Sequence, residues 1–236
     1  MMTTSANSIE STLSRRKFLG SAVAGAAATL VGGAATGFLA PEHALAQSNL
    51  TPDEALKELL DGNQRYLSGR FTSFDEDKQI LRDRTVEKQQ PFAALLSCAD
   101  SRVPVEIIFD QSIGEIFVTR IAGNISTSEI IASLEFGAGV LGTKVIMVLG
   151  HSSCGAVKSA IANSEVPGQI SALFPHLRAA VNQAGPDLVA TTKANAAIQA
   201  ALLSKSSTVL APLVEQGKLK IVGAYYDLGT GKVTLV

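Results

Sequence analysis

The chain has 236 residues, 46% of them hydrophobic, and its formal net charge is −1. This length and apolar content suffice for one globular core, and a net charge so close to zero argues against a nucleic-acid-binding surface. The chain contains only two cysteines, Cys98 and Cys154. From their number alone they could form a disulfide, fill the core or bind a metal.

The first 46 residues have the features of an export signal that is removed from the mature protein. Arg15 and Arg16 lie in a segment that resembles a twin-arginine signal, and an uncharged stretch rich in alanine and glycine follows at 21–40. The segment 44–46 then supplies the small-x-small pattern of a cleavage site before Gln47. A membrane anchor is the alternative because about 20 residues can span a bilayer, but this stretch is only weakly apolar.

We therefore expect the export machinery to carry the precursor to the periplasm, with the thylakoid lumen and the extracellular space as alternatives. The mature chain, 47–236, has no internal repeat, no low-complexity linker and no other segment long and apolar enough to span a membrane. It is predicted to form a single domain. Because twin-arginine export carries folded proteins, a metal could be loaded before the protein reaches an oxidising compartment.

The mature domain is predicted to begin with a helix. Thr51 fits the N-cap, Pro52 fits the first turn and Glu54 completes a capping box. An apolar stripe with helical spacing continues to about residue 67. The residues that follow, 71–90, are polar and irregular, with a short helix expected at 80–86.

The rest of the chain alternates between predicted strands and helices. Three apolar runs are expected to be buried strands: 91–97, 115–120 and 144–149. Four helices are expected, the first with a capping box at 126–129: 126–141, 155–163, 170–183 and 187–216. A C-terminal hairpin is expected from two strands and a turn: 219–226, 227–231 and 232–236. This order predicts an α/β fold with a mainly parallel sheet flanked by helices and an antiparallel C-terminal edge.

Two of the predicted strands end in loops that carry reactive side chains. Cys98 follows the first run, and His151 and Cys154 follow the third. In open α/β sheets ligands bind outside the carboxyl ends of the strands, so these three side chains can converge at one edge. Two thiolates and one imidazole suit zinc, and three protein ligands leave its fourth position open. A disulfide between the cysteines is an equal alternative at this point, although it leaves His151 without a role.

The two loops resemble the signatures of the β-class carbonic anhydrases. Residues 98–102 read C-x-D-S-R and residues 151–154 read H-x-x-C, in the order and at the separation of that family. The likeness covers about 50–236 and includes further segments: Pro104–Asp110, Arg120–Asn124, Ser133–Phe136 and Gly150–Val157. It favours a metal over a disulfide and implies one zinc ion per chain, held by Cys98, His151 and Cys154.

The resemblance implies the reversible hydration of carbon dioxide to bicarbonate and a proton. Zinc lowers the pKa of a bound water, so that a zinc-bound hydroxide can attack carbon dioxide near neutral pH. Thiolates donate more charge than imidazole and oppose this effect, so other groups must offset it. Asp100 is expected to accept a hydrogen bond from the water and to orient the hydroxide. Arg102 is expected to fix Asp100 and to keep it from binding zinc.

The resemblance also implies substrate contacts and a homodimer or a higher oligomer of dimers. Gln89 matches a glutamine that helps to hold substrate in many plant-type members, and a solvated loop glutamine is the alternative. Backbone amides at the start of the helix from Gly155 would favour negative charge near the metal. In the family the N-terminal helices lie across the partner subunit. The 51–67 helix is therefore expected to be a dimer arm, with core packing as the alternative, and Gln89 to reach the neighbour's site.

The sequence departs from part of the family at Leu95. Many bacterial members that bind a regulatory bicarbonate carry tryptophan three residues before the first zinc cysteine, whereas this chain has no tryptophan. We therefore expect the tryptophan-dependent version of that site to be absent. Arg120 matches an arginine that serves this site in some members and packing in others. His176, the other histidine of the mature chain, is expected to be an exposed helix residue rather than a proton shuttle.

Two other function classes stay open from the sequence. One is a different hydrolase on the same fold, acting on carbon disulfide or carbonyl sulfide and releasing sulfide. The other is a non-catalytic zinc-binding or interaction protein. The presence of both Asp100 and Arg102 argues against the second, since a protein without catalysis does not need them.

Overall fold

The computed structural model describes residues 48–73, 83 and 85–236 of the chain. The predicted export signal at 1–46 and most of the predicted helix at 80–86 lie outside the described residues. None of the helices in the described part combines the length and the hydrophobicity that a membrane crossing requires.

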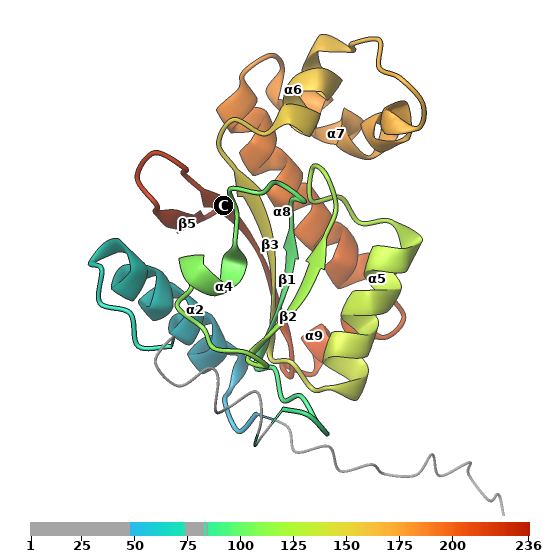
Figure 1. Cartoon of the computed structure of the whole chain (residues 1–236). Helices are drawn as coiled ribbons and strands as arrows, with labels where there is room; N and C mark the ends of the chain where they lie inside the picture. The colour runs from blue at the N-terminus through green and yellow to red at the C-terminus, as the bar shows by residue number, and fades with distance from the viewer. Residues whose placement is uncertain (1–47, 74–82, 84) are drawn as a thin grey trace, which may run out of the picture. The chain divides into compact units, whose positions relative to one another are not determined.

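Five strands form one sheet in the order β2-β1-β3-β4-β5 (Figure 1). The strands are β1 (Ala93–Ser97), β2 (Ile116–Arg120), β3 (Val145–His151), β4 (Lys220–Tyr226) and β5 (Val233–Leu235). The first four are mutually parallel, and β5 runs antiparallel to β4 at the edge. The predicted mainly parallel sheet with an antiparallel C-terminal edge is therefore confirmed.

The order of the strands reverses at β1. The chain passes from β1 to β2 on one side, and β3 then pairs with β1 on the other side. In open α/β sheets such a switch point opens a crevice beyond the carboxyl ends of the two strands, because their connections leave in opposite directions. The loop after β1 and the loop after β3 therefore meet at one place.

Helices cover both faces of the sheet and one of its ends (Figure 1). The helices of the first face are α2 (Pro52–Leu67) and α4 (Val105–Ile108), which pack on alternate strand residues such as Leu95 and Met147. The helices of the second face are α5 (Ser128–Glu135), α8 (Leu188–Ser206) and α9 (Leu210–Glu215), which pack on the intervening residues such as Leu96 and Val148. A third cluster joins the loops beyond β1 and β3 to α6 (Gly155–Ala162) and α7 (Phe174–Ala184).

Several predicted boundaries were wrong, and two of them concern the helix predicted at 126–141 and the strand predicted at 144–149. The helix predicted to begin with a capping box at 126–129 begins at Ser128, and its N-cap Thr127 makes no side-chain capping bond. It then passes into a π-helix, η1 (Phe136–Val140), where a side chain at Gly137 would come within 3.1 Å of Phe117. The expected strand at 144–149 continues to His151, because its last residues still pair with β4.

The helix predicted at 187–216 is two helices, α8 and α9. Between them, the hydroxyl of Ser207 accepts hydrogen bonds from the backbone N–H groups of Val209 and Leu210. Pro212 lies in the first turn of α9, where its missing N–H is tolerated, whereas inside one continuous helix it would remove a hydrogen bond. The helix predicted at 170–183 likewise begins with a short 3-10 turn (Ile170–Leu173) before α7. His176 is exposed on α7, as expected.

Helix α2 begins as predicted, with Thr51 as N-cap and a complete capping box with Glu54. Its buried face packs on the sheet of its own chain through Ala55 and Leu59. The buried amide of Asn63 donates to the carbonyl oxygens of Ile108 and Gly231 and accepts from the backbone N–H of Val233. In this structure α2 therefore packs on the core of its own chain, which was the alternative from the sequence, and its role as a dimer arm stays a prediction.

The buried carboxylate of Asp110 ties the end of α2 to the end of α4. It accepts hydrogen bonds from Nε of Arg65 (2.6 Å) and from the backbone N–H and hydroxyl groups of Thr72 and Ser73. Burial by itself raises the pKa of this carboxyl, but the hydrogen bonds from Arg65, Ser73 and Thr72 outweigh it and lower the pKa to about 2.

We predict that Asp110→Asn lowers the free energy of unfolding most at neutral pH. The folded pKa is below the unfolded value of 3.8, so the charge stabilises the fold above about pH 4, and this contribution disappears as the pH falls towards 2. A shift of this size corresponds to about 2 kcal/mol. Urea unfolding at pH 7, 4 and 3 should show a difference from the wild type that narrows with acidification. A difference that is independent of pH would contradict this account, and Asp61→Asn, at an exposed ion pair, is the control.

Candidate metal centre

Three potential metal ligands converge at the carboxyl ends of β1 and β3. Cys98 follows β1 directly, His151 is the last residue of β3, and Cys154 is the N-cap of α6. Their ligand atoms all lie within 4.8 Å of one another, and all three residues are buried. The convergence follows from the switch point, since β1 and β3 are neighbours in the sheet although 50 residues separate their loops.

The imidazole of His151 has one nitrogen available to a metal. Its Nδ1 lies 2.9 Å from the carbonyl oxygen of Ser152, and since a carbonyl only accepts, Nδ1 carries the proton. Its Nε2 is therefore a lone-pair donor. Among the described residues this buried Nε2 has no hydrogen-bond partner, which is unusual for a polar atom without a ligand.

The two neighbouring thiols shift each other's pKa in opposite directions. The Sγ–H of Cys154 donates to Cys98 and lowers the pKa of the Cys98 thiol to about 4, and the backbone N–H of Gly123, 3.3 Å from the Cys98 sulfur, acts in the same direction. That same thiol–thiolate contact, together with burial, raises the pKa of Cys154 above its ordinary value. Zinc binds cysteine as the thiolate, so a divalent cation displaces the thiol protons when it binds such a pair.

These residues fit zinc. Tetrahedral zinc places sulfur and nitrogen ligands about 3.5–4 Å apart, and the three ligand atoms here already lie within 4.8 Å of one another. The set combines two adjacent thiol groups with one imidazole nitrogen that has no hydrogen-bond partner in the described part of the chain. Three protein ligands are the number that catalytic zinc sites use, because the fourth position is kept for water or substrate.

A carboxylate lies beside the ligands, held by an arginine. Oδ1 of Asp100 accepts from the backbone N–H and from Nε of Arg102, both at 2.9 Å, and Oδ2 accepts from Nη2 of Arg102 at 2.8 Å. This bidentate ion pair with Arg102 holds the pKa of the Asp100 carboxyl well below its usual range. Oδ2 is also 3.8 Å from Nε2 of His151, so the carboxylate faces the position between the three ligands.

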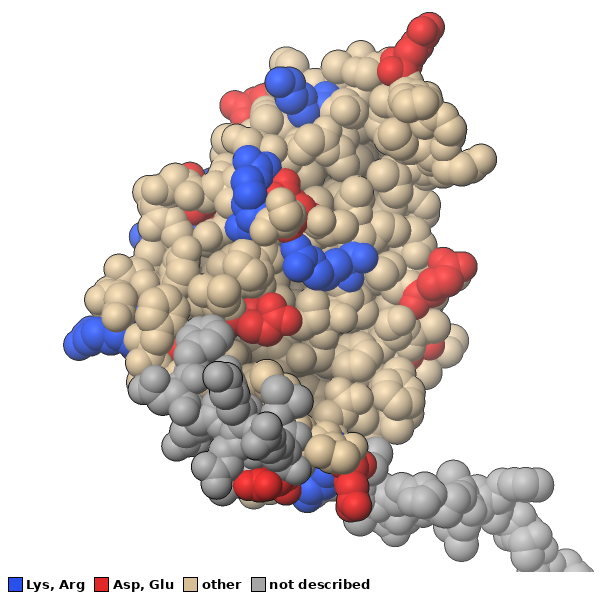
Figure 2. Space-filling view, viewed as in Figure 1, with Lys and Arg blue, Asp and Glu red and all other residues tan. Residues whose placement is uncertain are grey.

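Arg120, at the end of β2, supports the backbone of the same loop. Its Nε donates to the carbonyl oxygen of Cys98 at 3.0 Å, and its Nη2 donates to the carbonyl oxygen of Asp100. Arg102 also reaches across to the carbonyl oxygen of Ser153, which joins the first loop to the second. Figure 2 shows basic and acidic side chains gathered on this face, much of which is otherwise uncharged. These contacts of Arg120 could not be predicted from the sequence, where only its match to the family was visible. The carbonyl groups that it binds belong to the backbone of the loop after a different strand.

The two predicted substrate-binding residues lie at opposite ends of the sheet. Gly155 is exposed at the first turn of α6, directly after Cys154, and a side chain there would meet no atom within 4 Å. Gln89 is exposed before β1, whereas the metal ligands lie beyond its other end. Within one chain, the structure therefore brings together Cys98, His151, Cys154, Asp100 and Arg102, with Gly155 beside them, and leaves Gln89 apart.

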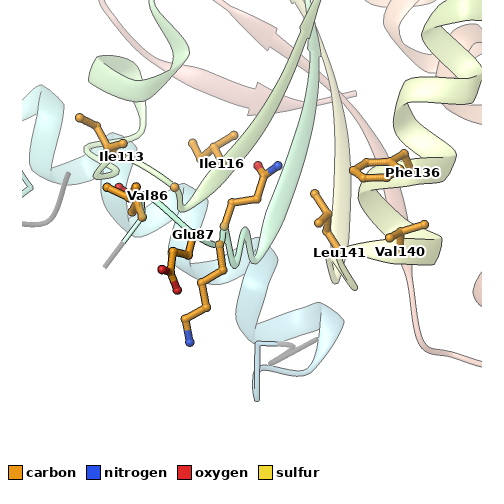
Figure 3. Close-up of a pocket in the computed structure, with 11 residues that line it drawn as sticks. Val86, Glu87, Ile113, Ile116, Phe136, Val140 and Leu141 are labelled. Atoms are coloured by element: carbon orange, nitrogen blue, oxygen red, sulfur yellow. The ribbon is translucent and has the colours of Figure 1, made fainter. Parts of the chain in front are cut away.

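Gln89 instead lines a groove of about 760 Å³ beside β2 (Figure 3). Exposed apolar side chains surround the groove: Val86, Ile113, Phe136 and Val140. They come from the segment before β1, the approach to β2, and η1, and Figure 3 shows them on both sides of a shared opening. An apolar groove at the edge of a sheet is a potential contact surface.

Comparison with known proteins gives consistent matches. The family model described as carbonic anhydrase matches residues 93–233. Carbonic anhydrase 2 of Mycobacterium tuberculosis is 33% identical over 201 residues, which cover 79% of this chain and 94% of that protein. A carbonic anhydrase of Mycolicibacterium smegmatis is 34% identical over the same shares of the two chains.

Solved structures share the fold. A tetrameric β-carbonic anhydrase from Sordaria macrospora superposes with a TM-score of 0.63 at 19% identity, over 78% of this chain and 97% of that one. The β-carbonic anhydrase CafA of Aspergillus fumigatus superposes with a TM-score of 0.62 at 24% identity, over 77% of this chain and 90% of that one.

We predict about one zinc ion per purified chain, as the three-ligand geometry requires. Cys98→Ser and Cys154→Ser should each lose most of the metal, because a hydroxyl is a far weaker zinc ligand than a thiolate. Elemental analysis of the purified protein measures this. Ser153→Ala is the matched control within the same loop and should keep its zinc. A folded, zinc-free wild type with a Cys98–Cys154 disulfide would overturn the assignment.

Proposed function

Because the chain belongs to the β-class carbonic anhydrase family, we propose that it hydrates carbon dioxide reversibly to bicarbonate and a proton at the metal centre described above. Zinc is its cofactor. The observation that carries the proposal is the meeting of two buried thiols, an imidazole nitrogen without a partner and an arginine-held carboxylate at one switch point. Stopped-flow measurement of carbon dioxide hydration by the mature protein, with zinc content determined in parallel, tests it. Sulfide release from carbon disulfide without hydration would indicate the other hydrolase instead.

The chemistry that zinc supplies in such a site is the activation of water as a nucleophile near neutral pH. The protein must keep the fourth position open and orient that nucleophile. Oδ2 of Asp100 faces the space between the ligands and can accept a hydrogen bond there, since the carboxylate stays ionised beside Arg102. Accepting this hydrogen bond fixes the direction in which the nucleophile's lone pair points.

Arg102 keeps Asp100 available for this task. A carboxylate two residues from a ligand cysteine could itself reach the metal and close the fourth position. The paired hydrogen bonds from Nε and Nη2 of Arg102 compete with that movement. The contact of Arg102 with the carbonyl oxygen of Ser153 supports the same geometry from the second loop.

Apolar side chains close the inner side of the centre. Ile125 and Val157 are fully buried and cluster with both cysteines. They limit the access of bulk water from behind, so charge interactions at the ligands are stronger than in solvent. Carbon dioxide carries no net charge and can approach such a wall without a large desolvation cost.

We further propose that the chain works as a homodimer or a larger assembly of dimers. The support is the apolar groove beside β2, with Gln89 at its wall and Phe136 and Val140 exposed by 47% and 45%. A second copy packed on this surface would bury these side chains. It would also give Gln89 a route to a metal centre, the partner's, which its own chain does not provide.

Export to the periplasm is also a proposal. It rests on Arg15 and Arg16, the apolar stretch that follows them and the small residues before Gln47. The metal centre provides a physical reason to export the chain after it has folded, since thiolates already bound to zinc are protected from oxidation.

We predict that Arg102→Ala lowers the turnover of carbon dioxide by two orders of magnitude or more, the scale seen when a preorganised polar group is lost. The freed Asp100 should bind the metal, and a crystal structure of the zinc-loaded variant at neutral pH would show it. Arg178→Ala removes an exposed arginine from α7 and should leave turnover unchanged. Undiminished turnover in Arg102→Ala would contradict the role of the pair.

Val140→Lys should convert the assembly to monomers and lower activity in parallel, because a charge replaces an apolar contact at the groove. Size-exclusion chromatography with light scattering measures the mass. Val189→Lys, at a position with similar exposure on α8, is the control.

Mixing inactive Gln89→Ala with inactive Arg102→Ala should restore part of the activity if Gln89 acts across the dimer. An active monomer would refute the shared site.

Replacing Arg15 and Arg16 together by lysine should hold the precursor in the cytoplasm, because the export pathway reads the arginine pair. Fractionation followed by N-terminal sequencing should find the wild type in the periplasm, beginning at Gln47. Lys17→Gln removes a neighbouring charge but keeps the pair and should still be exported. Uncleaved wild-type chain in the membrane fraction would favour an anchor.

A further inference from the structure

The backbone N–H of Gly123 points at the sulfur of Cys98, and the segment that carries it is strained. Gly123 has φ +79° and Asn124 has φ +43°, so two consecutive residues adopt left-handed backbone conformations. A side chain at Gly123 would come within 3.4 Å of both Ala156 and Leu177. Such conformations persist only where the surrounding structure enforces them. Something outside the segment must therefore hold it.

Two buried amides of α8 hold this segment. Nδ2 of Asn195 donates to the carbonyl oxygen of Gly123 at 2.9 Å. One turn later, Oε1 of Gln199 accepts from the backbone N–H of Ser126 at 2.9 Å. Both side chains are almost inaccessible to solvent, at 0% and 2% exposure. The segment 121–126 is thus fixed on both sides of its left-handed residues.

The side-chain amides of Asn195 and Gln199 also hold each other in orientation. Nε2 of Gln199 donates to Oδ1 of Asn195 at 3.2 Å and to the carbonyl oxygen of His176 at 3.1 Å. These bonds determine which end of each amide group faces the segment. Buried amides paired in this way have one orientation, because a flip would place a donor against a donor and leave an acceptor facing an acceptor.

Helix α8 is itself held rigidly on the sheet. A side chain at Gly150 of β3 would come within 2.9 Å of Thr192, and one at Gly223 of β4 would come within 2.9 Å of the backbone of Ala196. The two glycines therefore let the helix approach the strands closely. Asn195 and Gln199 project from the turns of α8 next to these close approaches.

We propose that Asn195 and Gln199 are positioning residues of the metal centre, which hold the N–H of Gly123 on the sulfur of Cys98. The inference rests on the proposed zinc function. An N–H group that donates to a thiolate withdraws charge from it. With two thiolates in the ligand set, this withdrawal offsets part of the charge they donate to the metal, and it also holds Cys98 in place for binding.

The decisive comparison is between Asn195→Leu and Thr191→Val. Thr191 lies on the same helix, is equally buried and donates to the carbonyl oxygen of Gly185, so its variant also loses one side-chain-to-backbone bond. That bond does not involve 121–126. Zinc affinity is measured by competition with a chelator, and the sulfur-to-cobalt charge-transfer band is recorded after cobalt replaces zinc.

Asn195→Leu should bind zinc about tenfold more weakly, as is typical when support of a ligand is lost. Its charge-transfer band should move to lower energy because the sulfur becomes richer in electrons. Thr191→Val should match the wild type in both. Equal behaviour of the two variants would reduce Asn195 to a structural role and overturn the proposal.

If Asn195→Leu does not fold, Gln199→Met decides, since it loses the bond to Ser126 and should shift the band in the same direction. An unshifted band in Gln199→Met would then reject the proposal. A wild type that binds no zinc, or binds it without hydrating carbon dioxide, would instead reject the function on which the inference rests.

Discussion

The structure depends on one electrostatic constraint, which is the burial of two thiols and an imidazole within 4.8 Å of one another. A buried pair of thiolates is unstable unless positive charge or N–H groups compensate for it. The surroundings meet this demand with the N–H of Gly123 at Cys98 and the backbone amides at the start of α6 at Cys154. A divalent cation supplies the rest, which is why the centre and the fold around it are coupled.

The sheet topology brings the three ligands together with little loss of conformational entropy in the loops. Because the strand order reverses at β1, two loops far apart in sequence leave the same edge of the sheet and need no long excursion to meet. Arginines then connect the loops. Arg120 binds the backbone of the first loop, and Arg102 binds both Asp100 and the second loop. Arg102 thus holds the carboxylate directly, while Arg120 and the carbonyl oxygen of Ser153 fix the surrounding backbone and Arg102 itself.

The same sheet separates two tasks between its ends. The carboxyl ends of the strands carry the metal ligands, whereas the groove beside β2 presents Gln89 and exposed apolar side chains. A single chain keeps these features apart. In the proposed dimer a second copy would bring them together and would also bury apolar surface. Helix α2 stays with its own core in this arrangement.

The sequence by itself determined the strands, the capped first helix and the three candidate ligands. Each of these is encoded locally, in apolar runs, in Thr51 with Glu54, and in short motifs such as residues 98–102 and 151–154. Only the tertiary structure decided what depends on distant partners. The core packing of α2, the break between α8 and α9 and the loop contacts of Arg120 are of this kind. Asn195 and Gln199 carried no local signal, because an amide in an alanine-rich helix acquires its role only when the sheet places a strained backbone segment against it.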